Sequence, residues 1–151
     1  MTICFDMDGT IANLYGVKGW LNDLENESTR PYEIAKPLVD MRELHKILMR
    51  CRALDINIHV ISWASKNADP AFAERIGRAK FDWLEKYRFP YDFCHIIPYG
   101  ESKSEIVKRY LAENETALIF DDDARVRANW LLGEAIDPTT HDILEILRSL
   151  F

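Results

Sequence analysis

The chain has 151 residues, 48% of them hydrophobic and 29% charged, which predicts one soluble domain with an apolar core. Its formal net charge of −6 argues against extended nucleic-acid binding, though not against a nucleotide or a strand end at a metal ion. No apolar run reaches membrane-spanning length and no secretion signal is recognisable, so we expect a cytoplasmic protein without a membrane partner.

The first expected element is a short apolar strand over residues 2–6 that leads into the string FDMDGT. Side chains two residues apart in a strand share a face, so Asp6 and Asp8 should converge at its carboxyl end, where Gly9 permits a tight turn. Adjacent carboxylates repel unless a cation or a shared proton intervenes, and oxygen ligands suit Mg²⁺. The motif predicts a metal site or an acid and nucleophile pair, with an ordinary Asx-type turn as the alternative.

Residues 11–36 form a segment that the core does not need. Four apolar residues in it predict a short amphipathic helix: Val17, Trp20, Leu21 and Leu24. The dipeptide Arg30-Pro31 is typical of a turn. Several aromatic side chains could either stack on a base or sugar or pack on the core, and we favour packing: Tyr15, Trp20, Tyr32 and Trp63.

The middle of the chain predicts helix, strand and helix in turn. The first helix should run to about residue 54 with Pro37 in its first turn. A strand over residues 56–61 then ends at Ser62, whose hydroxyl can donate to a phosphate oxygen or cap the segment that follows. The second helix, over about residues 70–87, should bury one face of apolar residues: Phe72, Ile76, Leu84 and either Phe81 or the stem of Lys80.

A later apolar run over residues 117–120 ends abruptly in Asp121, Asp122 and Asp123. Three acids at the tip of a buried strand are costly without a counterion, although we expect Asp123 to cap the next helix. Lys103 precedes this strand in a loop-to-helix segment, where it could neutralise a phosphate and a carboxylate together. A solvated surface lysine is the alternative.

The whole pattern alternates strands with helices, which predicts an α/β fold with a mostly parallel, five-stranded, Rossmann-like sheet and helices on both faces. The strands are expected at residues 2–6, 56–61, 93–97, 117–121 and 134–136. The remaining helices are expected at 104–112, from about 125, and at 143–150. In such sheets ligands bind outside the carboxyl ends of the strands, which is where Asp6, Ser62 and Asp121 fall.

The order and spacing of these residues resemble the haloacid dehalogenase-like superfamily of phosphohydrolases. The likeness rests on four motifs: Asp6 with Asp8, then Ser62, then Lys103, then Asp121 with Asp122. It covers nearly the whole chain, and it implies a single catalytic domain over residues 1–151 with residues 11–36 as a flap or miniature cap. The strings SWASKN and YGESK also resemble small phage and bacterial hydrolases, which favours Lys103 over Lys108 as the third motif.

The resemblance implies a Mg²⁺-dependent phosphatase that forms an aspartyl-phosphate. Asp6 would be the nucleophile and Asp8 the general acid and base. The metal would lie among Asp6, the backbone carbonyl of Asp8, Asp121 and Asp122. The backbone amides after Asp6 would hold the phosphoryl oxygens. The residues expected to bind the substrate are Gly9, Thr10, Ser62, Trp63 and Lys103.

We expect the substrate to be a small phosphomonoester, with nucleotides as the leading class. A polynucleotide-end or phosphoprotein phosphatase is the alternative enzyme, because a nearly capless site admits large substrates. A receiver-like signalling domain also places acids, a hydroxyl and a lysine around Mg²⁺, but its phosphoacceptor would follow a middle strand, and here that strand ends in Ser62. A catalytically idle phosphate-binding module is the last alternative, and the intact set of catalytic residue types argues against it.

Overall fold

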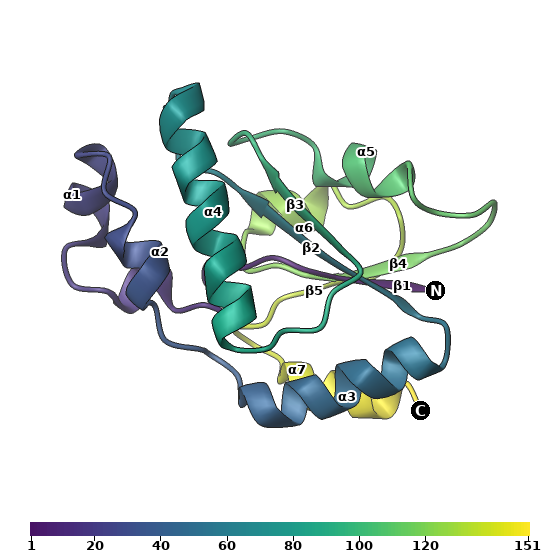
Figure 1. Cartoon of the computed structure of the whole chain (residues 1–151). Coiled ribbons are helices and arrows are strands. Elements are labelled where there is room, and N and C mark those ends of the chain that lie inside the picture. Colours follow the sequence, from purple (N-terminus) through teal and green to yellow (C-terminus); the bar gives the residue numbers. More distant parts are fainter.

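At the centre of the computed structural model, which describes residues 1–151, five parallel strands form one sheet in the order β3-β2-β1-β4-β5 (Figure 1). The strands are β1 (Thr2–Phe5), β2 (Asn57–Trp63), β3 (Phe93–Ile97), β4 (Ala117–Phe120) and β5 (Ala135–Ile136). Each lies within two residues of its expected range. The predicted five-stranded, Rossmann-like fold is confirmed, and its sheet is entirely parallel.

Helices cover both faces of this sheet, as predicted. They are α1 (Trp20–Glu25), α2 (Arg30–Ile34), α3 (Met41–Ala53), α4 (Pro70–Lys86), α5 (Lys103–Lys108), α6 (Ala124–Ala128) and α7 (Ile143–Ser149), with a 3₁₀ turn η1 (Leu14–Gly16). No helix combines the length and hydrophobicity that a bilayer crossing requires. The segment with α1 and α2 lies beyond the carboxyl ends of the strands (Figure 1).

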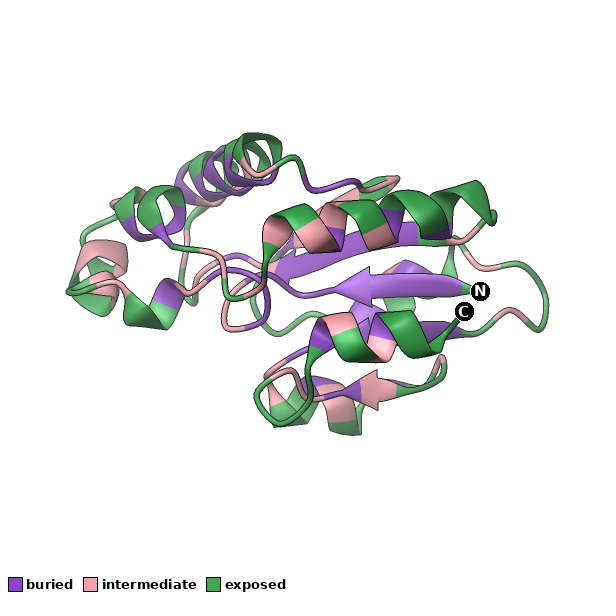
Figure 2. Cartoon of the chain, turned by 90° about the horizontal axis from the view of Figure 1, so that it is seen from below, coloured by how far each residue is buried: buried purple, intermediate pink, exposed green.

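Alternation along the strands divides the core between the two faces. Ile3 and Phe5 of β1 pack with Leu48 of α3 on one face, together with α7 and the end of α4. Cys4 points to the other face and belongs to the cluster that holds Val107 of α5 and Val126 of α6. Figure 2 shows the strands buried between helices whose outer surfaces are exposed. The loops at the strand ends are thereby held on a rigid base.

The expected start of the helix after the cap segment is wrong. It begins at Met41 because the Asp40 side chain caps it, accepting from the backbone N–H of Arg42 and Glu43 at 3.0 and 3.2 Å. Pro37 lies outside the helix, in a bridge with Ala12 that ties the two ends of the cap segment together.

The cap segment also differs in detail from the expected single helix and turn. Pro31 lies near the start of α2, where its missing N–H leaves no hydrogen bond unmade, so Arg30-Pro31 belongs to a helix rather than a turn. Val17 precedes α1, and Leu21 is exposed. Elsewhere α5 ends at Lys108, four residues before its expected end.

Candidate active site

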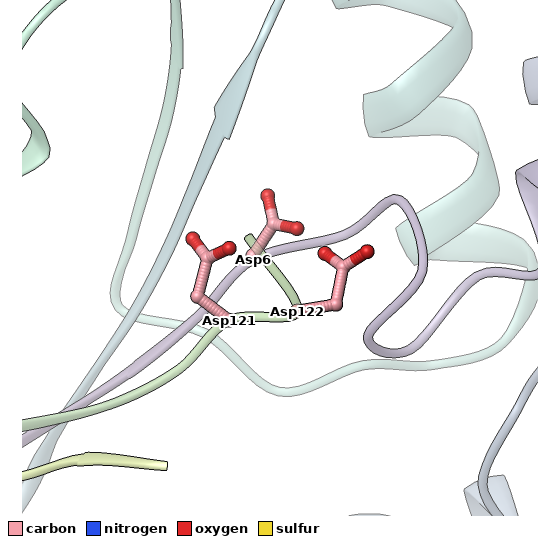
Figure 3. A group of neighbouring side chains, drawn as sticks. All are labelled: Asp6, Asp121 and Asp122. Carbon is pink, nitrogen blue, oxygen red and sulfur yellow. The ribbon is translucent and has the colours of Figure 1, made fainter. Parts of the chain in front are cut away.

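Three carboxylates converge at the carboxyl end of the sheet. Asp6 follows β1, and Asp121 with Asp122 follows the adjacent strand β4; one ligand oxygen from each lies within 4.8 Å of the other two (Figure 3). The pairing of β1 with β4 sets this arrangement, because the backbone N–H of Asp6 donates to the Phe120 carbonyl at 3.0 Å. Asp6 and Asp121 are buried and Asp122 is half-buried. Three acids therefore share a site that water reaches poorly.

Lys103, at the start of α5, joins the buried pair. Its Nζ donates to Asp6 Oδ1 at 2.9 Å and to Asp121 Oδ2 at 2.6 Å. Burial works against the charged amine, but the charges of Asp6 and Asp121 outweigh it and raise the pKa of Lys103. The indole of Trp63 lies against it, with Nζ 5.2 Å from the ring centroid. Lys103 is thus a fixed cation between two strand ends, rather than a solvated surface lysine.

The remaining negative charge is not offset within the chain. The pKa of Asp121 is raised to about 7 and that of Asp122 to about 8, first by burial and then by the charge of Asp6. Four carboxylates gather here with Asp8 included, and two buried lysines, Lys80 and Lys103, face them. Two negative charges are left when every group is ionised. An oxygen-rich site with that deficit fits a divalent cation such as Mg²⁺.

The loop after Asp6 depends on glycine. Gly9 has φ of +76°, and a Cβ there would overlap the Asp122 carboxylate and lie 2.9 Å from Tyr15 Cε2. The next residue, Thr10, donates its hydroxyl to Asp6 Oδ2 at 3.4 Å. Within this loop the backbone N–H groups of Met7 and Asp8 donate to no acceptor of the chain, whereas those from Gly9 to Ala12 are bonded inside the loop. Two donors beside Asp6 are therefore free to bind an anion.

Asp8 and Ser62 meet at a residue that the sequence did not single out as functional. Lys80 of α4 is 1% exposed, and its Nζ donates to Asp8 Oδ2, Ser62 Oγ and the Trp63 carbonyl at 2.8, 2.7 and 2.8 Å. Phe81, the other candidate for this buried position, is 39% exposed. The signal was present in the sequence, since a lysine that continues the spacing of Phe72 and Ile76 faces the core and needs buried partners.

A cavity of about 310 Å³ opens above these groups. Its floor is polar and includes most of the expected site residues: Asp6, Asp8, Lys103, Asp121 and Asp122. Its walls are largely aromatic and aliphatic: Leu14, Tyr15, Trp20, Leu21, Leu24, Tyr32, Trp63 and Tyr99. Ser62 does not reach the walls, because it is buried beneath them with Lys80. Gly9 and Thr10 shape the loop beside Asp6.

Two solved structures of D,D-heptose 1,7-bisphosphate phosphatase share this architecture. One, from B. bronchiseptica and complexed with magnesium and phosphate, aligns with 99% of this chain and 97% of that chain, at 13% identity and a TM-score of 0.56. The fold is haloacid dehalogenase-like. The second structure, from Burkholderia thailandensis, aligns with 88% of this chain and 74% of that chain, at 14% identity and a TM-score of 0.52. No family model and no curated protein matches the sequence.

Proposed function

We propose that this protein is a Mg²⁺-dependent phosphatase that hydrolyses a small phosphomonoester through a phosphorylated Asp6. One observation carries the proposal: four carboxylates and a buried lysine form the floor of a single cavity at the carboxyl edge of the sheet. The magnesium and phosphate bound by the fold relative from B. bronchiseptica support it. We propose residues 11–36 as a miniature cap on a catalytic domain that spans residues 1–151.

Asp6, Asp121, Asp122 and the backbone carbonyl of Asp8 would hold the metal ion. When bound, Mg²⁺ would offset the charge of these carboxylates and of an incoming phosphate. The raised pKa values of Asp121 and Asp122 support this assignment, because they reflect the same crowding of negative charge that a cation relieves. Asp123 is engaged elsewhere: it caps α6 through the backbone N–H of Arg125 and pairs with the Arg125 side chain at 2.7 Å.

In the first chemical step an oxygen of Asp6 attacks phosphorus, and the bond from phosphorus to the leaving oxygen breaks. Asp8 gives its proton to that oxygen. Burial raises the pKa of Asp8 despite the opposing charge of Lys80, which suits a group that must hold a proton. Lys103 and the free N–H groups of Met7 and Asp8 bind the phosphoryl oxygens, where charge gathers in the transition state.

In the second step water attacks phosphorus and passes a proton to Asp8. The bond between phosphorus and Asp6 breaks, which releases inorganic phosphate and restores both carboxyl groups. One residue therefore acts first as an acid and then as a base, as the symmetry of the two steps requires. Ser62, which the sequence led us to expect at a phosphoryl oxygen, lies buried beneath the cavity and its Oγ accepts from Lys80, so it would support the site from below rather than contact the phosphate.

The cavity favours a small leaving group over a polymer end. Trp20, Leu21 and Leu24 of the cap line the cavity on one side, and its volume of about 310 Å³ is at the lower end of small-molecule sites. The aromatic side chains that surround it suit a flat or partly apolar leaving group. We therefore retain nucleotides as the leading class of substrate.

The proposal is tested first by its metal dependence. We expect hydrolysis of p-nitrophenyl phosphate that requires Mg²⁺ and stops in excess chelator, because the acids otherwise repel the substrate. Mg²⁺ at a hundred times its dissociation constant should also raise the melting temperature by roughly 5–10 °C. That increase should be larger at pH 8.5 than at pH 6, since protons on Asp121 and Asp122, with pKa values of about 7 and 8, compete with the metal.

The raised pKa values of Asp121 and Asp122 also set how the stability of the metal-free protein depends on pH. Between the unfolded pKa near 4 and the folded values, the folded chain holds protons that the unfolded chain has lost, so the metal-free protein loses stability as pH rises.

Asp82→Asn on the exposed face of α4 should behave like the wild type, whereas Asp122→Asn should weaken the Mg²⁺ effect. Turnover in excess chelator would contradict the proposal, and an equal Mg²⁺ effect at both pH values would contradict the assignment of these ligands.

A second expected result concerns selection of the leaving group. Tyr15 is 52% exposed, lines the cavity and contacts Trp20 edge to face with centroids 5.0 Å apart. Tyr15→Ala should change the ratio of kcat/KM between a nucleoside monophosphate and a sugar phosphate by about tenfold, because base stacking contributes roughly 1–3 kcal/mol. Turnover of p-nitrophenyl phosphate should be spared.

The matched control for Tyr15→Ala is Tyr110→Ala, at an exposed tyrosine outside this cavity. Trp20→Ala should shift the same ratio but also lower stability, since Trp20 packs against the cluster of Leu14 and Tyr32. A uniform loss of all activities with a lower melting temperature in both cap variants would mean that these rings only pack the cap.

A further inference from the structure

Lys80 is the buried charge that the mechanism above leaves without a role. It lies on α4, and its Nζ donates all three of its hydrogen bonds to groups of the site or the strand beside it: Asp8 Oδ2, Ser62 Oγ and the Trp63 carbonyl. The ring of Tyr32 from the cap covers it, with the centroid 4.8 Å from Nζ. Lys80 is therefore closed off from the cavity and cannot touch a substrate.

The contacts of Asp8 are asymmetric. Oδ2 accepts from Lys80, whereas Oδ1 makes no hydrogen bond within the chain and is not a buried atom. Since Asp8 lines the cavity, the unbonded oxygen is the one that a leaving group can meet. The hydrogen bond from Lys80 to Oδ2 also fixes the direction in which Oδ1 points. Lys80 therefore determines that Oδ1 is the oxygen of Asp8 that carries the transferred proton.

Ser62 is oriented by the same nitrogen. Its Oγ accepts from Lys80, so the hydroxyl hydrogen must point away from Nζ. One side chain thus fixes two groups from different strand ends: Asp8, beyond β1, and Ser62, on β2. Hydrogen bonds from a charged donor are short and strong, which suits the placing of groups to within a fraction of an ångström.

We propose that Lys80 is a positioning residue for phosphoryl transfer: it aims Asp8 Oδ1 at the leaving oxygen, and the buried Ser62 Oγ and Trp63 carbonyl hold its Nζ in place. This inference rests on the proposed phosphatase function. It assigns Lys80 a task distinct from that of Lys103, which binds Asp6 and Asp121 on the other side of the site. Loss of Lys80 should therefore damage proton transfer to the leaving group more than the attack on phosphorus.

The test compares p-nitrophenyl phosphate with phenyl phosphate, which are similar in shape. Nitrophenolate leaves readily without a proton, whereas phenolate needs one. Asp8→Asn should lower kcat/KM for phenyl phosphate by roughly 10²–10⁴-fold. Lys80→Met should lower kcat/KM for both substrates, and the loss for phenyl phosphate should be on the order of tenfold larger than the loss for p-nitrophenyl phosphate. The loss should lie in kcat with KM little changed, since Lys80 does not contact the substrate.

The double variant Asp8→Asn/Lys80→Met should lose no more on phenyl phosphate than Asp8→Asn alone, because Lys80 acts through Asp8. Ser62→Ala removes one of the three acceptors that hold Lys80, so it should change the ratio of the two substrates in the same direction as Lys80→Met, and by less. Leu84→Ala, which removes a fully buried side chain from the same helix, controls for destabilisation and should leave the ratio of the two substrates unchanged. If Lys80→Met does not fold, Lys80→Gln, whose shorter side chain has two donors for the three acceptors, carries the comparison with a smaller expected difference between the two substrates.

The outcomes separate the two proposals. A wild type that hydrolyses neither phosphate with Mg²⁺ would overturn the phosphatase function and this inference with it. An active wild type in which the folded Lys80 variant slows both substrates by the same factor, or in which the two substitutions are additive, would overturn the role of Lys80 alone.

Discussion

Asp6→Asn is expected to abolish turnover, with kcat reduced by at least about 10⁴-fold, because the proposed reaction passes through a bond between an Asp6 oxygen and phosphorus. An amide oxygen does not form the corresponding acyl phosphate. The wild type, quenched in acid during turnover, should gain the mass of one phosphoryl group on the peptide that contains Asp6, and the variant should not. Measured together, turnover and labelling test the same atom in two independent ways.

The fold should survive this substitution. The change to an amide removes one of several crowded carboxylates, which offsets the loss of one hydrogen bond to Lys103, a residue that still contacts Asp121 at 2.6 Å. The melting temperature without Mg²⁺ should therefore stay close to that of the wild type, and Asp82→Asn provides the exposed control for the same chemical change. Wild-type turnover in Asp6→Asn would rule out the covalent route.

The sequence predicted the fold and the ends of the strands because both follow from local patterns. Short apolar runs that stop at acids placed Asp6 and Asp121 at one edge of a parallel sheet, and β1 and β4 are neighbours in the structure. The cap of α6 by Asp123 also follows from local chemistry, since a carboxylate at that position accepts from the first N–H groups of the helix.

Other features depended on contacts between distant segments. Lys80 lies 72 residues from Asp8 and 18 from Ser62, so the helical spacing showed only that its stem was a candidate for burial. The partners of its charged end depend on how α4 packs against the end of β2, which the sequence pattern does not specify. The start of α3 was wrong for a different reason: Pro37 is a good first-turn residue, but the Asp40 cap and the bridge from Pro37 to Ala12 determine the boundary.

Lys103→Met should be the most destabilising of the site substitutions. It leaves the buried carboxylates of Asp6 and Asp121 without the cation that lies 2.9 and 2.6 Å from them. Removal of one partner from a buried ion pair costs about 3–5 kcal/mol in the free energy of unfolding. Loss of the cation that we propose to bind the transferring phosphoryl group should lower kcat by roughly 10²-fold or more. Urea unfolding and turnover measure the two effects separately.

Lys108→Met is the matched control, because Lys108 is exposed on the same helix and was the other candidate for this motif. It should change the free energy of unfolding by less than about 0.5 kcal/mol and leave turnover intact. Equal effects of the two substitutions would refute the assignment of Lys103 to the site.

The pH dependence of Lys103→Met gives the final test. Asp121 already has a pKa raised to about 7, and removal of Lys103 takes away the charge that opposes this rise. Asp121 in the folded variant should therefore take up a proton at a higher pH than Asp121 in the folded wild type. The stability deficit of the variant relative to the wild type should then be largest near pH 8 and should shrink as pH falls toward 5. Mg²⁺ should shrink the deficit at pH 8 in the same way, because it supplies positive charge to the same carboxylates. A deficit that is independent of both pH and Mg²⁺ would mean that Lys103 contributes through packing of its stem rather than through its charge.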